Sequence, residues 1–199
     1  MSKTENNKYI LKLAAILFAI CFIATLLLTL CNHLTKDRIA QLATQTENLA
    51  RQEVIPGAEF ELINTSDYAD ELSAYSFVEA YKATNDGDFS GYCISVAPQG
   101  FNGPVSMIVG VKEDGSYYGV KITSLSETPG LGAKAQEEDF YGQFSQGKTG
   151  VLEVVKNNPN PSESEISAIS GATITSKAVT SGVNDALEIA KILNEKEAE

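Results

Sequence analysis

A nearly continuous apolar run near the start of the chain, Leu13–Cys31, is interrupted only by Thr25 and Thr29. Its nineteen residues would span about 28 Å as an α-helix, close to the ~30 Å hydrocarbon thickness of a bilayer. The run is longer than the apolar part of a typical signal peptide, and no small-x-small cleavage pattern follows it. We therefore expect a retained anchor that crosses the membrane once.

The segment after this run, His33 to Val54, contains neither Gly nor Pro and carries apolar residues compatible with one face of a helix. Pro56-Gly57 then supplies a stop signal. The pattern predicts a stalk helix that continues from the anchor. It divides the chain into a tail and anchor (residues 1–32), a juxtamembrane stalk helix (33–57) and a domain (58–199).

Alternation of apolar and more polar positions in the middle of the chain predicts a sheet. The predicted strands are Gly91–Val96, Val105–Val111 and Tyr118–Ile122, with Asp114-Gly115 as a tight turn between the last two. Residues 58–88 are mixed and acidic, and only the turn signal Asn85–Asp88 stands out there. We expect an antiparallel meander with one face on the core and one wetter face.

The last part of the chain predicts two further strands and a helix. Val151–Val155 and Ile166–Ile169 are short apolar runs, and residues 157–164 between them form a loop with Pro, Ser and Asn. Lys177–Asn194 has apolar residues at helical spacing, typical of a helix that packs on a sheet. The predicted fold class is α+β: one transmembrane helix and a stalk helix, then an antiparallel-sheet domain with a C-terminal helix.

The charges along the chain predict its orientation. Three lysines precede the apolar run, whereas Lys36, Asp37 and Arg38 follow it, which favours a cytoplasmic N-terminus and a domain on the extracytoplasmic side. Subtracting the +2 of residues 1–32 from the total of −11 leaves −13 for the rest. So acidic a domain disfavours nucleic acid as a partner and should be held off an anionic lipid surface.

Composition also limits the chemistry that the chain can perform. Two of its three cysteines lie in the anchor, so Cys93 has no partner for a disulfide within the domain and fits a buried core position. The single histidine, His33, falls at the membrane interface and cannot build a histidine-rich metal site or a catalytic triad. We expect no metal site and no catalytic residue set.

The stretch Ser170–Ser176 lies between a predicted strand and a predicted helix. Gly171 and Ala172 are small and allow close approach of backbone or ligand. Thr173, Thr175 and Ser176 place hydroxyl groups at the helix start, where they can cap free N–H groups. The residues alone fit two interpretations, a capped helix or a glycine turn that seats a phosphate at a helix N-terminus.

A second loop, Ser126–Lys134, follows the predicted meander. Pro129-Gly130 is typical of a type II turn, and Gly132 adds another flexible position. By itself this pattern indicates a surface loop.

Together these features resemble the FMN-binding domain family found in the G subunit of Rnf complexes and in the C subunit of Na⁺-pumping NADH:quinone reductase. The resemblance covers roughly residues 9 to 193, and the compact loops are more similar to those of the Rnf family branch. The matching features, in chain order, are the anchor, Leu49-x-x-x-x-Val54-Ile55-Pro56-Gly57-Ala58, Gly91-Tyr92 with Gly100-Phe101-x-Gly103-Pro104, Glu127-Thr128-Pro129-Gly130-Leu131-Gly132, and Ser170-Gly171-Ala172-Thr173-x-Thr175.

The resemblance implies a cofactor, FMN, joined through its phosphate to the hydroxyl of Thr173 by a flavin transferase. Thr175 is the alternative attachment residue. The loop would lie against the flavin ring, with Leu131 as apolar surface. Thr128, Glu127 and backbone N–H groups near the glycines would supply hydrogen bonds to the pyrimidine edge. Lys134 pairs either with the phosphate or with the acidic run 137–139. The implied cofactor-binding residues are Ser170, Gly171, Ala172, Thr173, Thr175, Glu127, Thr128, Gly130, Leu131, Gly132 and Lys134.

The resemblance also implies a function in the membrane. The chain would be a subunit of an Rnf-type complex that moves electrons between ferredoxin and NAD⁺ and translocates Na⁺ or H⁺. It would relay electrons through its FMN, would not be catalytic alone, and would assemble with other membrane subunits. Two alternatives are the C subunit of a Na⁺-translocating NADH:quinone reductase, and an anchored assembly or sensing module without flavin.

Overall fold

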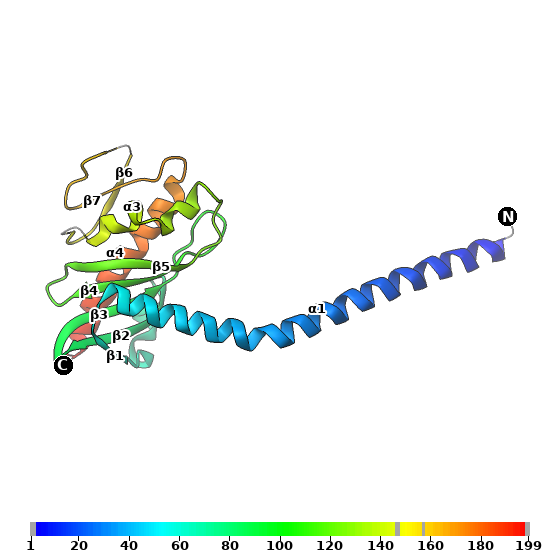
Figure 1. Cartoon of the computed structure of the whole chain (residues 1–199), viewed down its shortest axis with the longest axis horizontal. Helices are drawn as coiled ribbons and strands as arrows, with labels where there is room; N and C mark the ends of the chain where they lie inside the picture. Colours follow the sequence, from blue (N-terminus) through cyan, green and yellow to red (C-terminus); the bar gives the residue numbers. More distant parts are fainter. Residues whose placement is uncertain (1–2, 146–147, 157, 198–199) are drawn as a thin grey trace. The chain divides into compact units, whose positions relative to one another are not determined.

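The computed structural model describes residues 3–145, 148–156 and 158–197 (Figure 1). Its contacts divide it into two units, Met1–Gln45 and Thr46–Glu199, which we describe separately. Residues 1–2 of the predicted tail, Asn157 of the predicted loop, and residues 146–147 and 198–199 of the predicted domain lie outside the described part. The three-part division at residues 32/33 and 57/58 stays a prediction.

The first unit is formed by helix α1 (Lys3–Val54), whose last turns belong to the second unit. By length and composition this helix can cross a membrane, since an 18-residue window has a mean hydropathy of 2.8 and no part of it is buried. Thr25 and Thr29 donate their hydroxyl protons to carbonyls four residues earlier, at 2.7 and 2.8 Å. Both hydroxyls are therefore satisfied within the helix, as a lipid environment requires.

Helix α1 ends at Val54, two residues before the stop signal Pro56-Gly57. The N–H of Ile55 donates to the carbonyl of Arg51 at 2.9 Å, and the chain then turns through Pro56 and Gly57. Gly57 has a φ of +77°, a left-handed conformation that glycine adopts without strain at a helix end.

The second unit is built on a five-stranded antiparallel sheet with the order β1-β2-β3-β4-β5. The central meander and its turns confirm the prediction. Asp86 and Gly87, with φ values of +52° and +90°, form the tight turn between β2 and β3, and Gly115 lies in the turn between β4 and β5. The strands are β1 (Glu59–Leu62), β2 (Phe77–Asn85), β3 (Asp88–Val96), β4 (Ser106–Lys112) and β5 (Tyr117–Ser124).

Strands β1 and β2 were not apparent from the hydrophobic pattern. The pairing of β2 with β3 shifts register between Phe77 and Glu79 and again between Ala83 and Thr84. Each shift breaks the period of two that identifies a strand in a sequence. Strand β1 is an edge strand with mostly exposed residues, so it carries no apolar alternation. Short helical turns, η1 (Ser66–Tyr68) and α2 (Ala69–Leu72), separate the two strands.

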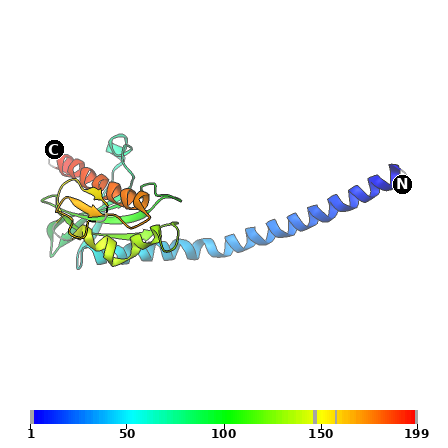
Figure 2. The same ribbon diagram turned by 90° about the horizontal axis from the view of Figure 1, so that it is seen from above.

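Both faces of the sheet are covered. Helix α4 (Thr173–Glu197) packs on one face, and the end of α1 packs on the other (Figure 2). The prediction of a wetter second face is therefore wrong for the part of the sheet beneath α1, because the stalk supplies apolar side chains there. This smaller cluster consists of Ala50, Val54, Ile55, Ala58, Ala83, Cys93 and Ile108.

Glycines allow both helices to approach the sheet closely. A Cβ added to Gly110 of β4 would lie 2.6 Å from Cγ1 of Val54 at the end of α1. A Cβ added to Gly182 of α4 would lie 2.7 Å from Cε of Met107 in β4. Neither position has room for a larger side chain, so the sheet is held tightly between the two helices.

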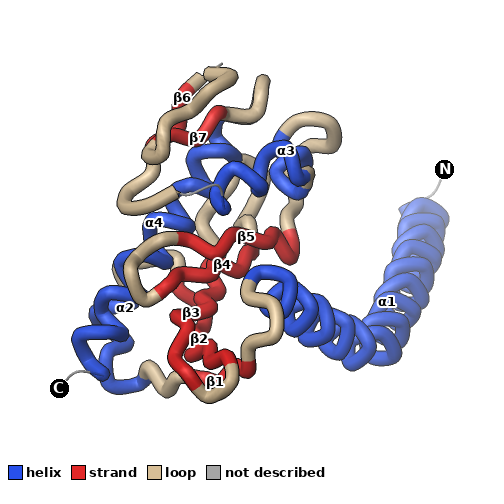
Figure 3. Tube along the Cα trace, turned by 60° about the vertical axis from the view of Figure 1, so that its left-hand side comes forward, coloured by secondary structure: helices blue, strands red, loops and turns tan. Residues whose placement is uncertain are grey.

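The chain between β5 and α4 forms a smaller layer. Predicted strands at Val151–Val155 and Ile166–Ile169 are confirmed in shorter form as β6 (Glu153–Val155) and β7 (Glu165–Ser167), which pair in parallel. Figure 3 shows this small sheet separate from the five-stranded one, with helical segments between them. Before β6 come three short helices, η2 (Gly132–Gln136), α3 (Glu138–Tyr141) and η3 (Gly142–Ser145).

Arg51 joins the end of α1 to the sheet through polar contacts. Its Nη1 lies 3.1 Å from Oε1 of Glu79 in β2, and its Nη2 donates to Oδ1 of Asn48 at 3.0 Å. The guanidinium stands 4.0 Å from the ring centre of Tyr81. Hydrogen bonding and stacking thus satisfy a buried cation.

Replacing Gly110 by Ala should destabilise the domain by about 2 kcal/mol, because the new methyl group meets Val54 and overpacks the interface. We expect a drop in melting temperature of roughly 6 °C for a protein of this size. Thermal unfolding of the full-length protein in detergent, followed by tyrosine signals, measures this drop. Gly103→Ala is the matched control, since the nearest atom to its Cβ, in Ser126, is 3.9 Å away. Equal melting temperatures for both variants would contradict the packing argument.

Cys93 should resist alkylation in the folded protein. Its side chain is 1% exposed, and burial raises the pKa of its thiol to about 12. The thiolate is the reactive form, so at pH 9 only about one thiol in a thousand would be ionised. We expect iodoacetamide at pH 9 to leave Cys93 unmodified until denaturant is added, as judged by peptide mass spectrometry. Rapid native labelling would show that the strand opens.

Candidate functional site

The loop that follows β5 makes the predicted type II turn. The N–H of Leu131 donates to the carbonyl of Thr128 at 3.2 Å, which closes the turn around Pro129 and Gly130. Gly130 has a φ of +76°, as the third position of this turn requires. The turn presents Leu131 outward at its end, with 43% of its surface exposed.

A second glycine turn leads into α4. The N–H of Ala172 donates to the carbonyl of Ile169 at 3.0 Å, and Gly171 between them has a φ of +76°. The helix begins at Thr173, earlier than the predicted start at Lys177, so the hydroxyl residues occupy its first turn.

Ser176 locks this turn, in a different way from the predicted cap. Its hydroxyl accepts a hydrogen bond from the N–H of Ile169 at 3.0 Å and donates one to the carbonyl of Ala172 at 3.0 Å. The side chain is fully buried. The hydroxyl therefore fixes the backbone before the helix and does not cap the N–H groups of the helix itself.

The two glycine turns meet at a hollow of about 360 Å³. A Cβ on Gly171 would lie 3.0 Å from Cδ2 of Leu131, which shows how closely the turns approach. The volume is within the range of small-molecule sites. The lining residues are Phe101, Glu127, Thr128, Leu131, Gly132, Gly171, Ala172, Thr173, Ile174 and Thr175.

Three large apolar side chains around this hollow remain exposed to solvent. Phe101 is 64% exposed, Leu131 43% and Ile174 56%. Exposed apolar groups that gather at one hollow are typical of a binding site. Such walls suit a flat, largely apolar ligand.

The hollow distinguishes the two candidate threonines. Thr173 is half-buried and also lines a neighbouring hollow of about 210 Å³, together with Lys156 and residues 168–171. Thr175 is only 1% exposed. A reagent or enzyme from solvent can therefore reach the hydroxyl of Thr173 more readily than that of Thr175.

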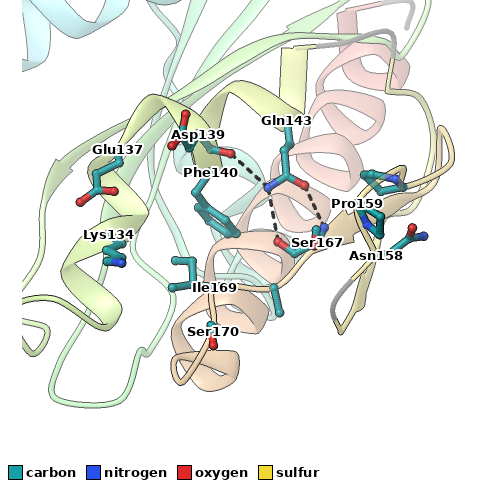
Figure 4. A pocket seen from close by; sticks show the side chains of 12 residues that line it. Lys134, Glu137, Asp139, Phe140, Gln143, Asn158, Pro159, Ser167, Ile169 and Ser170 are labelled. Carbon is teal, nitrogen blue, oxygen red and sulfur yellow. Dashed lines mark hydrogen bonds between the residues drawn. The ribbon is translucent and has the colours of Figure 1, made fainter.

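Lys134 lies in a different place from the other candidate residues. It lines a third hollow of about 480 Å³ beside Glu137 and Asp139, and Ser170 lies at the edge of the same hollow (Figure 4). Gln143 crosses this region and holds Ser167 by two bonds, accepting from its N–H at 2.8 Å and donating to its carbonyl at 3.3 Å. Lys134 shares this hollow with two residues of the acidic run, and the choice between its two predicted partners stays a prediction.

Most of the sequence-predicted residues surround one hollow, whereas three do not. Gly130 shapes its turn without lining the hollow, and Ser170 and Lys134 line other hollows. Sequence reasoning missed Phe101, Ile174 and Lys156 as site residues. Phe101 had a signal, the Gly100-Phe101-x-Gly103-Pro104 motif, and Ile174 had one as the x of Ser170-Gly171-Ala172-Thr173-x-Thr175. Lys156 lies near the site only through the tertiary fold.

Among the described residues, no group of three or more His, Cys, Asp and Glu side chains is placed to hold a metal ion. The 360 Å³ hollow itself offers apolar walls, hydroxyl groups and the carboxylate of Glu127.

Comparison with known proteins places these features in a family. An FMN-binding domain family matches residues 100–188, which include every lining residue of the 360 Å³ hollow, and the RnfG N-terminal region matches residues 1–54. The G subunit of the Na⁺-translocating ferredoxin:NAD⁺ oxidoreductase complex of Acetobacterium woodii is 38% identical over 193 residues, covering 92% of each chain. The chain belongs to the Rnf G-subunit family. It therefore carries an FMN-binding domain.

Other members of the Rnf G-subunit family align over similar lengths. The G subunit of the proton-translocating ferredoxin:NAD⁺ oxidoreductase complex of Clostridium ljungdahlii is 32% identical over 188 residues, covering 94% of this chain and 95% of that one. The G subunit of an ion-translocating oxidoreductase complex from Methanosarcina acetivorans is 30% identical over 187 residues, covering 92% and 96%. Relatives of this kind favour the G subunit over the C subunit that the sequence left as an alternative.

Two solved structures share the fold. The C subunit of the Na⁺-translocating NADH-quinone reductase of Parabacteroides distasonis superposes with a TM-score of 0.55 at 22% identity, covering 78% of this chain and 96% of that one. NqrC of Shewanella oneidensis gives 0.52 at 21% identity, covering 61% of each chain. The Rnf G-subunit domain and these two proteins therefore have a common architecture.

Proposed function

We propose that this chain is the FMN-carrying subunit of an Rnf-type ferredoxin:NAD⁺ oxidoreductase complex that translocates Na⁺ or H⁺. The observation that carries the proposal is the full-length similarity to G subunits of such complexes, joined to a hollow whose walls fit a flavin. The chain works within the complex, together with other membrane subunits, and is not catalytic alone.

The residues around the 360 Å³ hollow suit FMN. Phe101, Leu131 and Ile174 offer apolar contact to a ring system. The glycines at 132 and 171 bring backbone close to the ligand without a side chain in the way. When bound, FMN supplies the redox chemistry, and the protein supplies position and electrostatic environment.

The hydroxyl of Thr173 is the proposed point of attachment. A flavin transferase would form a bond between its Oγ1 and the phosphorus of FMN while one P–O bond at that phosphorus breaks. The leaving oxygen takes up the hydroxyl proton, so that water is released overall. The partial exposure of Thr173 supports this assignment. Thr173 also stands at the start of a 25-residue helix, where the helix dipole favours a negative phosphate. Lys156, which lines the adjoining hollow, adds a positive charge on the same side.

We further propose that α1 crosses the membrane once with its N-terminus in the cytoplasm. The lysines before the apolar run support this orientation. The flavin domain then lies on the extracytoplasmic side. There a covalent bond keeps the cofactor from being lost by dilution.

Intact mass of the full-length protein, co-expressed with a flavin transferase, tests the attachment site. The wild type should gain the mass of FMN less one water, because ester formation releases water overall. Thr173→Ala should lose this gain completely and Thr173→Ser should keep it, since serine retains the hydroxyl. Thr175→Ala is the matched control and should remain flavinylated.

If only Thr175→Ala lacks the added mass of FMN, the proposed function stands and the attachment residue is Thr175. No gain in any variant, with the transferase active on a control substrate, would overturn the proposal of a covalent flavin.

Fusion reporters test the orientation. Alkaline phosphatase at the C-terminus should be active, because it folds only outside the cytoplasm, and green fluorescent protein at the same position should be dark. Green fluorescent protein at the N-terminus should fluoresce. The opposite pattern would place the flavin domain in the cytoplasm and contradict the orientation inferred from the flanking lysines.

A further inference from the structure

Two segments far apart in the sequence meet at Glu127. One is the turn between β3 and β4, where the N–H of Gly100 donates to the carbonyl of Gly103 at 2.9 Å. The other is the loop after β5. The N–H of Phe101, at the tip of the turn, donates to Oε1 of Glu127 at 2.7 Å. A charged acceptor at this distance makes a strong hydrogen bond.

The carboxylate of Glu127 lies in a slot that is closed on two sides by glycines. A Cβ added to Gly100 would lie 2.3 Å from its Oε1, and one added to Gly132 would lie 2.7 Å from its Oε2. Glu127 is 8% exposed. Within the described residues, no cation lies within 4.0 Å of it. A buried carboxylate without a counter-ion is costly, so the bond from Phe101 is its main compensation.

The contact determines the position of the Phe101 side chain. The bond from Gly100 to Gly103 closes the turn of residues 100–103. In addition to the bond with Glu127, the side-chain amide of Asn102 donates to Oγ1 of Thr128 at 3.3 Å and joins this turn to the loop after β5. Phe101 is 64% exposed yet lines the 360 Å³ hollow. Because most of the Phe101 side chain is exposed, packing does little to fix it, and its position follows from that of its backbone.

We propose that Glu127 is a positioning residue whose carboxylate holds the 100–103 turn so that Phe101 covers one face of the flavin. The proposal rests on the assignment of FMN to the hollow. It changes the role expected for Glu127 from a direct contact to the pyrimidine edge to a tie between the two walls. Its consequence is a flavin ring shielded from solvent on the Phe101 side.

Hydrogen exchange tests the tie without any flavin. The full chain, made without a transferase and kept in detergent, is compared with Glu127→Gln and Glu127→Ala by following the amide of Phe101. Glutamine keeps an acceptor oxygen, so exchange should stay slow in Glu127→Gln and rise about tenfold in Glu127→Ala, as expected when a hydrogen bond that holds a loop is lost. Equal rates in all three proteins would overturn the tie.

Quenching of flavin fluorescence tests the shield. Acrylamide is the probe because it is neutral and does not respond to the change in charge. In flavinylated protein, the quenching constant should rise about two- to threefold in Phe101→Ala and in Glu127→Ala, and stay at the wild-type value in Glu127→Gln. Val151→Ala is the matched control, since Val151 is 59% exposed but does not line the hollow.

Each result decides the proposal. An unchanged quenching constant in Phe101→Ala would overturn the shield, and an unchanged constant in Glu127→Ala would overturn the dependence of Phe101 on Glu127. If Glu127→Ala fails to fold, Phe101→Ala still tests the shield, and fast exchange of the Phe101 amide in the wild type would still overturn the tie. If the wild type takes up no flavin, the proposed function fails and the shield with it, whereas amide exchange at Phe101 still reports the tie.

Discussion

The close contact between helix α4 and the sheet at Gly182 determines where the hollow forms. A Cβ at this position would lie 2.7 Å from Cε of Met107 and 2.8 Å from Cγ of Pro98. Pro98 begins the loop that carries Phe101, and α4 carries Thr173 about 13 Å along the helix from Gly182. Glycine within a helix costs roughly 1 kcal/mol relative to alanine. That cost is offset by a contact that aligns the helix start with both walls of the hollow.

On the opposite face of the sheet, a glycine again allows a helix to approach closely, and the helix there is the end of α1. There the end of α1 lies on Gly110, and Arg51 adds its contacts to Glu79 and Tyr81. The contacts of the second unit accordingly extend back to Thr46. A domain cut at residue 58 would uncover Ile108 and Cys93, which are buried beneath α1. The last turns of the stalk are thus part of the core of the flavin domain.

How far the sequence predicts the structure depends on whether each feature is local. The turns at Asp86-Gly87, Pro129-Gly130 and Gly171 follow from φ values that single residues prefer, and all three were predictable in position. Strands β1 and β2 were not, since two register shifts and an exposed edge erase their alternation. The packing of the end of α1 on the sheet could not be predicted either, because no local pattern indicates it.

The site divides in the same way. Its motifs were visible in the sequence, but the meeting of Phe101 with Glu127 joins residues 26 positions apart through the fold. The difference between Thr173 and Thr175 is one of burial, which two neighbouring hydroxyl residues in one motif cannot reveal. The parallel pairing of β6 with β7 is likewise a tertiary result. Local chemistry therefore identified the pieces of the site, and packing decided their roles.

An open hollow and the proposed covalent tether would together retain the flavin and keep its ring accessible. Walls that remain about half exposed, such as Phe101, Leu131 and Ile174, bury little of a ligand, and affinity depends largely on burial. A closed pocket would bind FMN more tightly but would separate the ring from neighbours that exchange electrons with it. The proposed ester at Thr173 retains the flavin without enclosure, at an effective concentration on the order of millimolar. A tethered ring in an open hollow still needs a second contact to fix its orientation, and a wall held by a buried carboxylate supplies one while leaving the other side open.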